Sequence, residues 1–293
     1  NDEVLATNLE YGALDRTWNY YCKKQGARYV AQPISLPIAS KEQFIEEFWK
    51  GFSENTKVVF ISQITSTTGL ILPVKEICEE AKKRGLITIV DGAHVPGHIN
   101  LDLSKLKADF YTGACHKWMM TPKGCSFLYA KPEFQYMLDP LIISWGYESD
   151  NPSSSKFFDY HQFNGTRDFS AFLTVPKAVE FMNKYDWESI SSRFKSTLLI
   201  HASKLFDLLN VEPLAPLTNE FFGQLCSVEI NTNNPEELKS LLFEKYKIEI
   251  PIMLQGHKKY IRISFQAYNE VGDIDYLISS LKDIASTTRL LTI

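Results

Sequence analysis

Two side chains of opposite charge follow short apolar segments in the first half of the chain. Asp91 comes directly after segment 86–90, and Lys117 comes shortly after segment 109–112 and a run of small residues. An Asp at a strand end is often only a turn former, and most lysines are solvated surface charges. The two together are more informative, because the carboxyl ends of parallel strands share one edge of a sheet. They predict a carboxylate and an amine around one crevice.

One cofactor needs that combination of groups. Pyridoxal phosphate binds a lysine amine as a Schiff base, and a carboxylate at its ring nitrogen keeps the ring protonated as an electron sink. We therefore expect pyridoxal phosphate as the cofactor and no metal ion. No GxGxxG motif follows a strand, which disfavours a nicotinamide-dependent Rossmann enzyme.

Longer motifs around these residues resemble a known family. They are Val90-Asp91-Gly92-Ala93-His94-Val95-Pro96-Gly97, Ala108-Asp109-Phe110-Tyr111-Thr112-Gly113, Cys115-His116-Lys117-Trp118 and Pro122-Lys123-Gly124. The chain closely resembles the class V aminotransferase family, and within it isopenicillin N epimerase-like proteins. Segments 165–171 and 260–269 are similar to further motifs of this group, so the resemblance covers almost the whole chain. It implies the pyridoxal-phosphate-dependent fold type I.

The resemblance also implies roles for residues around the cofactor ring. Lys117 would carry the cofactor as an aldimine and later move the proton at the substrate α-carbon. Asp91 would pair with the ring nitrogen, His94 would contact the phenolic oxygen, and Tyr11 would stack on the ring face. Taken alone, Tyr11 could equally be a core aromatic residue at a helix start, and His94 a turn histidine.

Four further residues receive binding roles from the same resemblance. Ser66 would lie near the phenolic oxygen, His116 would contact the phosphate, and Thr166 would reach the phosphate bound by a neighbouring subunit. Arg262 would clamp the α-carboxylate of the substrate, since its planar fork suits bidentate binding. The alternative interpretations are a loop residue for Ser66, a surface cation for Arg262 and a helix cap for Thr166.

The reaction type stays open among several outcomes of one chemistry. The cofactor supports carbanion (quinonoid) chemistry that leads to epimerisation, C–S cleavage or transamination, depending on the walls of the site. A cysteine desulfurase needs a nucleophilic thiol on a mobile loop, and segments 140–165 and 255–260 contain no cysteine. We therefore expect an isopenicillin N epimerase-like enzyme acting on an amino acid or a peptide-like amine. The alternatives are a C–S lyase, an aminotransferase, and a non-catalytic dimeric homologue.

Composition sets the broad class of the protein. Hydrophobic residues make up 44% of the 293 residues and charged residues 23%, which is typical of a globular chain. The net charge is −4 and no block of like charges occurs, so nucleic acid is not an expected partner. Five cysteines without a CxxC pair, no secretory signal and no long apolar run predict a reduced, cytoplasmic protein away from membranes. The resemblance implies a homodimer with shared active sites.

The elements that must position these residues follow from the pattern along the chain. Alternating strands and helices up to about residue 130 predict a mainly parallel sheet with helices on both faces. Strands are expected at 4–7, 28–32, 58–62, 86–90, 109–112 and 126–130, and helices at 11–25, 40–51 (opened by a capping box at Ser40), 74–84 and 103–108.

A different texture begins near residue 140. Segment 140–165 shows little periodicity and predicts a long loop or a domain border. Beyond it, helices are expected at 171–184, 187–209, 236–246 and 274–284, and strands at 225–230, 248–250 and 260–265. We expect a large cofactor-binding domain over 1–165, and connecting helices with a small α+β domain over 166–293. Compared with the family, a segment before the first strand, including the phosphate-binding turn, is expected to be missing from the large domain.

Overall fold

A six-stranded sheet forms the centre of the computed structural model, which describes residues 1–293. The strand order is β2-β1-β3-β4-β5-β6. The strands are β1 (Glu3–Thr7), β2 (Arg28–Gln32), β3 (Thr56–Ser62), β4 (Ile87–Asp91), β5 (Phe110–Ala114) and β6 (Ser126–Ala130). Every neighbouring pair is parallel except β5 and β6. The predicted strands are therefore confirmed to within two residues at each end.

Helices cover both faces of this sheet, as the burial of β1 demonstrates. Val4 and Ala6 pack in a small cluster with Cys22 of α1 (Gly12–Gln25). Leu5 points the other way, into a larger cluster that contains Phe44 of α2 (Lys41–Trp49). Successive side chains of a strand alternate between faces, so α1 and α2 lie on opposite sides. Both faces of β1 are buried, which explains the apolar run at residues 4–6.

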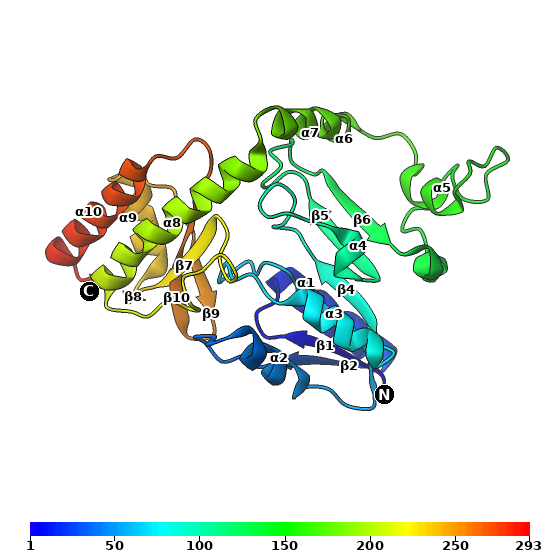
Figure 1. The fold of residues 1–293 in the computed structure, drawn as a ribbon, viewed down its shortest axis with the longest axis horizontal. Helices are drawn as coiled ribbons and strands as arrows, with labels where there is room; N and C mark the ends of the chain where they lie inside the picture. Colours follow the sequence, from blue (N-terminus) through cyan, green and yellow to red (C-terminus); the bar gives the residue numbers. More distant parts are fainter.

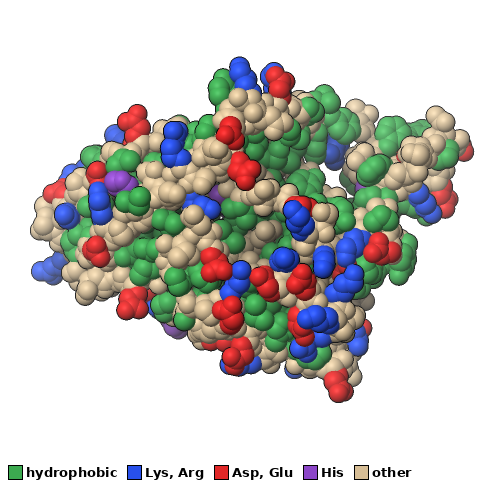
Figure 2. Space-filling model, viewed as in Figure 1, with side chains coloured by type: hydrophobic (Ala, Val, Ile, Leu, Met, Phe, Trp, Pro, Cys, Tyr) green, Lys and Arg blue, Asp and Glu red, His purple; other side chains and the backbone are tan.

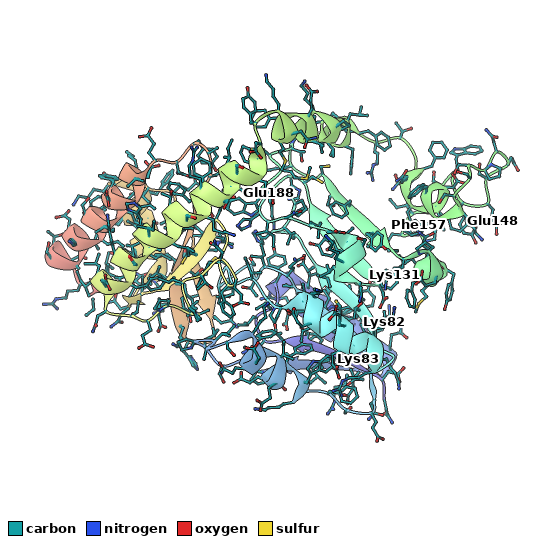
Figure 3. All side chains as sticks on the ribbon, viewed as in Figure 1. Lys82, Lys83, Lys131, Glu148, Phe157 and Glu188 are labelled. Carbon is teal, nitrogen blue, oxygen red and sulfur yellow. The ribbon has the colours of Figure 1, made fainter.

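Local sequence explains where the helices of this part begin and end. Ser40 accepts a hydrogen bond from the Gln43 N–H at 3.2 Å and so starts α2. The expected capping box differs in one bond, because the Gln43 side chain accepts from Ala39 N–H rather than from Ser40. Helix α3 (Val74–Lys83) ends with Lys82 and Lys83, which lie at the negative end of the helix dipole (Figure 3). A short helix, α4 (Leu103–Leu106), precedes β5.

The segment after β6 extends away from the sheet (Figure 1). It contains a 3₁₀ helix η1 (Pro132–Met137) and helices α5 (Lys156–Gln162), α6 (Ser170–Leu173) and α7 (Val175–Lys184). The expected single helix over 171–184 is wrong. Pro176 lacks an N–H and its ring obstructs the preceding turn, so the chain forms two helices with Thr174 between them. The expected loop over 140–165 holds one helix, α5.

The C-terminal part contains a second, smaller sheet. The elements of this C-terminal part are α8 (Trp187–Leu209), β7 (Leu225–Glu229), β8 (Asn231–Thr232), α9 (Pro235–Glu244), β9 (Ile252–Gln255), β10 (Lys258–Ser264), α10 (Val271–Thr287) and β11 (Leu291–Thr292). Strands β7, β10 and β9 pair antiparallel in that order. The expected strand at 248–250 is wrong. Ile250 is buried but unpaired, and β9 begins only after Pro251, so the apolar pattern reports burial and not strand pairing.

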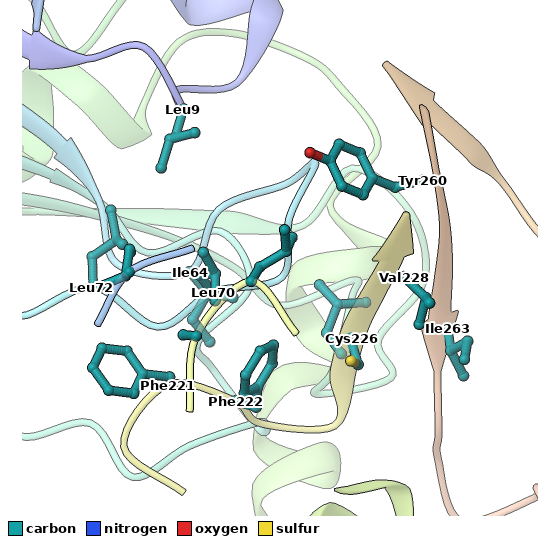
Figure 4. Packing of buried hydrophobic residues seen from close by; sticks show 14 of the residues in the cluster. Leu9, Ile64, Leu70, Leu72, Phe221, Phe222, Cys226, Val228, Tyr260 and Ile263 are labelled. Carbon is teal, nitrogen blue, oxygen red and sulfur yellow. The ribbon is translucent and has the colours of Figure 1, made fainter. Parts of the chain in front are cut away.

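The two sheets share one hydrophobic core of 48 buried residues. Figure 4 shows its central region, where Leu70 from the loop after β3 lies near Phe222 and Cys226. Tyr260 of β10 belongs to the same cluster. This packing fixes β10 relative to the loop that follows β3. The division of the chain at residues 165 and 166 stays a prediction. None of the helices is both long and apolar enough to cross a membrane.

Candidate active site

The carboxyl ends of three parallel strands meet where the predicted residues gather. Ser62, Asp91 and Thr112 are register partners on β3, β4 and β5. In an open parallel sheet, ligands bind just beyond these strand ends. The loops that leave this edge carry Ser66, His94 and Lys117, so the topology brings together residues that are far apart in sequence.

Asp91 is a buried carboxylate at this edge, with 8% of its surface exposed. Its Oδ1 accepts the Ala93 N–H at 2.9 Å, and desolvation by burial raises the pKa of the carboxyl group. Gly92 is needed beside it, because a Cβ at this position would lie 1.9 Å from the Tyr111 hydroxyl. A buried carboxylate with one backbone donor keeps acceptor capacity for a cationic N–H partner.

Lys117 lies in the loop after β5, and its side chain is exposed. The amine Nζ lies 3.2 Å from His94 Nε2. Desolvation by the surrounding protein lowers the pKa of this amine, the Asp91 carboxylate raises it, and the Arg262 charge lowers it again. A lowered pKa increases the fraction of neutral amine, which is the form that attacks a carbonyl carbon.

His94 lies beside Lys117 and is 9% exposed. Its Nδ1 accepts the indole N–H of Trp118 at 3.3 Å. Burial, followed by the nearby positive charges of Lys117 and Arg262, lowers the pKa of His94 to about 2. The ring is therefore neutral at physiological pH.

Arg262 reaches the same region from β10 of the smaller sheet. Its Nη1 donates hydrogen bonds to the backbone carbonyl and the hydroxyl of Ser66. Its Nε is buried and has no hydrogen-bond partner. An unpaired buried donor is costly, so this N–H indicates an anion-binding position. The structure thus brings two of the predicted residues, Ser66 and Arg262, into direct contact.

The other three predicted residues have looser surroundings. Tyr11 is the N-cap of α1 and is 51% exposed. His116 Nδ1 pairs with the Cys125 carbonyl at 2.8 Å, and a carbonyl can only accept. Its Nδ1 is therefore the donor in this contact, which leaves Nε2 as the ring nitrogen for any phosphate contact. Thr166 is exposed, makes no hydrogen bond and does not cap α6, whose N-cap is Phe169.

Sequence reasoning missed three buried residues at this site. Glu10 accepts hydrogen bonds from Thr7 and Ser62, and burial raises its pKa to about 7. Trp118 and His98 contact His94 at the ring Nδ1 and at the backbone carbonyl, respectively. Glu10 could have been found, since it is a polar residue shortly after an apolar strand, just as Asp91 is.

Comparison with known proteins adds the family. The family model of the class V aminotransferases matches residues 1–277. The chain belongs to this family. It is 29% identical over 295 residues to isopenicillin N epimerase of Amycolatopsis lactamdurans, covering 97% of this chain and 74% of that protein. It is 31% identical over 291 residues to isopenicillin N epimerase of Streptomyces clavuligerus, covering 95% and 73%. The predicted family and resemblance are confirmed.

Solved structures agree on the fold. The chain aligns with the cystine C–S lyase C-DES, solved with its reaction product cysteine persulfide, at a TM-score of 0.81 and 18% identity, covering 97% of this chain and 75% of that one. A mutant of the same lyase carries glycine covalently linked to the pyridoxal phosphate cofactor. Fold type I and pyridoxal phosphate are therefore confirmed, and this class V chain is a pyridoxal-phosphate-dependent enzyme.

The residues present fit that cofactor. Asp91 would supply a buried carboxylate for a protonated ring nitrogen, and Lys117 would supply an amine of lowered pKa for covalent attachment. The unpaired Nε–H of Arg262 supplies a donor for an anionic group in the same crevice. These three features correspond to what the cofactor and an amino acid substrate require.

Proposed function

We propose that this class V enzyme acts at the α-carbon of an amino acid or a peptide-like amine, in a reaction of the isopenicillin N epimerase type. The observation that carries the proposal is the cluster itself. An amine of lowered pKa, a buried carboxylate and a partnerless arginine N–H come together from two sheets. The two epimerases at 29% and 31% identity favour this reaction over the others.

Each residue of the cluster has a definite task in the proposed reaction. When bound, pyridoxal phosphate withdraws electrons from the α-carbon of the attached amino acid. Asp91 would hold the proton on the ring nitrogen, and Arg262 would orient the substrate through its α-carboxylate. Lys117 Nζ would then remove the α-proton, since a neutral amine can act as the general base.

Epimerisation also requires proton delivery to the opposite face of the α-carbon. We propose Tyr11 or Tyr268 as the second acid, from the position of these tyrosines in the family resemblance. Both phenols are accessible, at 51% and 80% exposed. Tyr11→Phe and Tyr268→Phe should each be assayed for racemisation and for exchange of the α-proton with solvent. Loss of racemisation with retained exchange in one variant identifies the acid, and unchanged rates in both variants exclude the two residues.

A C–S lyase is the second candidate, favoured by the fold shared with the cystine lyase. The route through a protein-bound persulfide has less support, because all five cysteines are buried and segments 140–165 and 255–260 carry none. Transamination requires the same residues, so product analysis must separate the three reactions.

The deciding experiment uses the protein loaded with pyridoxal phosphate. A panel of L- and D-amino acids, together with short peptides that carry a free α-amino group, is incubated in D₂O, followed by proton NMR and chiral chromatography. The proposal predicts exchange of the α-proton together with appearance of the opposite enantiomer. Release of sulfide and pyruvate, formation of a keto acid, or no reaction with any member of the panel would each overturn it.

We also propose a homodimer in which His116 contacts the phosphate and Thr166 reaches the phosphate bound by the neighbouring subunit. We propose the domain division at residues 165 and 166. Support comes from the projecting segment after β6, where Leu141 and Trp145 are largely exposed. Figure 2 shows apolar side chains on this projection. Figure 3 marks Phe157 on the same segment. Large exposed apolar patches are typical of contact surfaces. Sedimentation of the cofactor-loaded protein as a monomer would contradict the dimer.

A further inference from the structure

Trp118, the residue after Lys117, donates a hydrogen bond to the His94 ring nitrogen that faces away from Lys117. The indole is buried, with 7% of its surface exposed. Its Nε1 lies 3.3 Å from His94 Nδ1, while Lys117 Nζ lies 3.2 Å from His94 Nε2. The imidazole is therefore held between two neighbouring residues of the sequence, one at each ring nitrogen.

The chemistry of the indole decides where the proton of the imidazole resides. An indole N–H can only donate, so His94 Nδ1 must be the acceptor in this contact. A neutral imidazole has one acceptor and one donor nitrogen, which leaves the proton on Nε2. We propose that Trp118 is a positioning residue that fixes His94 as the Nε2–H tautomer and directs this donor toward the cofactor attachment point at Lys117.

Trp118 is itself held in place by a second histidine. The rings of His98 and Trp118 stack with centroids 4.0 Å apart and planes inclined by 27°. His98 Nε2 accepts the backbone N–H of Gln224, so the other nitrogen, Nδ1, donates to the His94 carbonyl at 2.9 Å. These contacts assign one tautomer to each histidine, and the His98 ring covers one face of the indole.

The smaller sheet supports this arrangement through a close backbone approach. Gly223 precedes Gln224, and a Cβ on Gly223 would lie 2.2 Å from His98 Nε2. The segment leading into β7 thereby presses against His98. The tautomer of His94 consequently depends on contacts from both parts of the chain. The inference rests on the proposed function only in taking Lys117 as the cofactor attachment point.

Histidine NMR tests the tautomer directly. The chain has six histidines, and cofactor-loaded protein labelled with ¹⁵N-histidine gives a small set of ring signals that a His94→Gln variant assigns. The proposal predicts one protonated and one bare ring nitrogen for His94, with the proton on Nε2. A wild-type spectrum with the proton on Nδ1 overturns the proposal without the need for any variant.

A matched pair of variants tests the role of Trp118. Trp118→Phe keeps an aromatic ring against His98 but removes the N–H, so both His94 nitrogens should shift to values averaged between the two tautomers. Trp187→Phe is the control, because it removes another indole N–H, bound to the Gly97 carbonyl at 2.9 Å, and should leave His94 unchanged. Retention of a pure Nε2–H signal in Trp118→Phe would overturn the proposal. The spectra do not depend on which reaction is catalysed, so this outcome is distinguishable from failure of the proposed function.

Discussion

Replacing Arg262 tests how the site selects an amino acid. Nη1 is occupied by Ser66, while Nε is buried without a partner, so the free edge formed by Nε and Nη2 offers two parallel N–H donors. Hydrogen bonds to charged groups contribute about 1.5–3 kcal/mol each. Because the side chain is only half-buried, the lower value applies, and Arg262→Ala should remove about 3 kcal/mol of transition-state binding. At about 1.4 kcal/mol per factor of ten, kcat/KM should fall roughly 10²-fold.

The assay compares two substrates and two further variants. An amino acid that reacts in the panel above is compared with the amine that lacks its carboxylate, and the loss in Arg262→Ala should appear for the amino acid alone. Arg262→Lys keeps one donor and should lose about tenfold. Lys258→Met, on the same strand but paired with Glu229 at 2.8 Å, is the control and should not change the ratio. Equal losses for the amino acid and the amine would refute carboxylate binding by Arg262.

Two further predictions concern stability. Burial raises the pKa of Glu10 from the ordinary 4.5 to about 7. Between these pH values the folded protein binds one proton more than the unfolded chain. The free energy of unfolding should therefore fall by about 3 kcal/mol as the pH rises through this range. In urea unfolding between pH 5 and 8, Glu10→Gln should lack this loss, and parallel pH curves for variant and wild type would disprove it. Gly223→Ala should cost about 1–3 kcal/mol because its Cβ meets His98. Gly272→Ala, with open space around it, should cost nothing, and equal stability of both variants would contradict the close approach.

The sequence was most informative where one strand or one helix decided the structure. Strands buried on both faces have continuous apolar sequences, so β3, β4 and the edge that carries Asp91 could be located before any coordinates. The Ser40 cap and helix α8 follow from local rules of the same kind. Where a local pattern has two causes, as at Ile250, burial was mistaken for strand pairing.

The contacts that tune the site could not be predicted from the sequence, because they depend on distant backbone segments. His98 meets the N–H of Gln224, 126 residues away, and Arg262 meets Ser66 across 196 residues. Trp118 reads as an ordinary apolar residue until its indole is seen against His94. These pairings arise from how the two sheets share a core, which no local periodicity encodes.

Covalent attachment of the cofactor at Lys117 is the central claim, and reductive trapping tests it most directly. The protein loaded with pyridoxal phosphate is treated with borohydride, digested and analysed by mass spectrometry, with Lys117→Ala treated in parallel. We predict loss of the visible absorption band and a phosphopyridoxyl group on Lys117, with none in the variant. A colourless wild-type protein after loading, or a label on another lysine, would contradict the account.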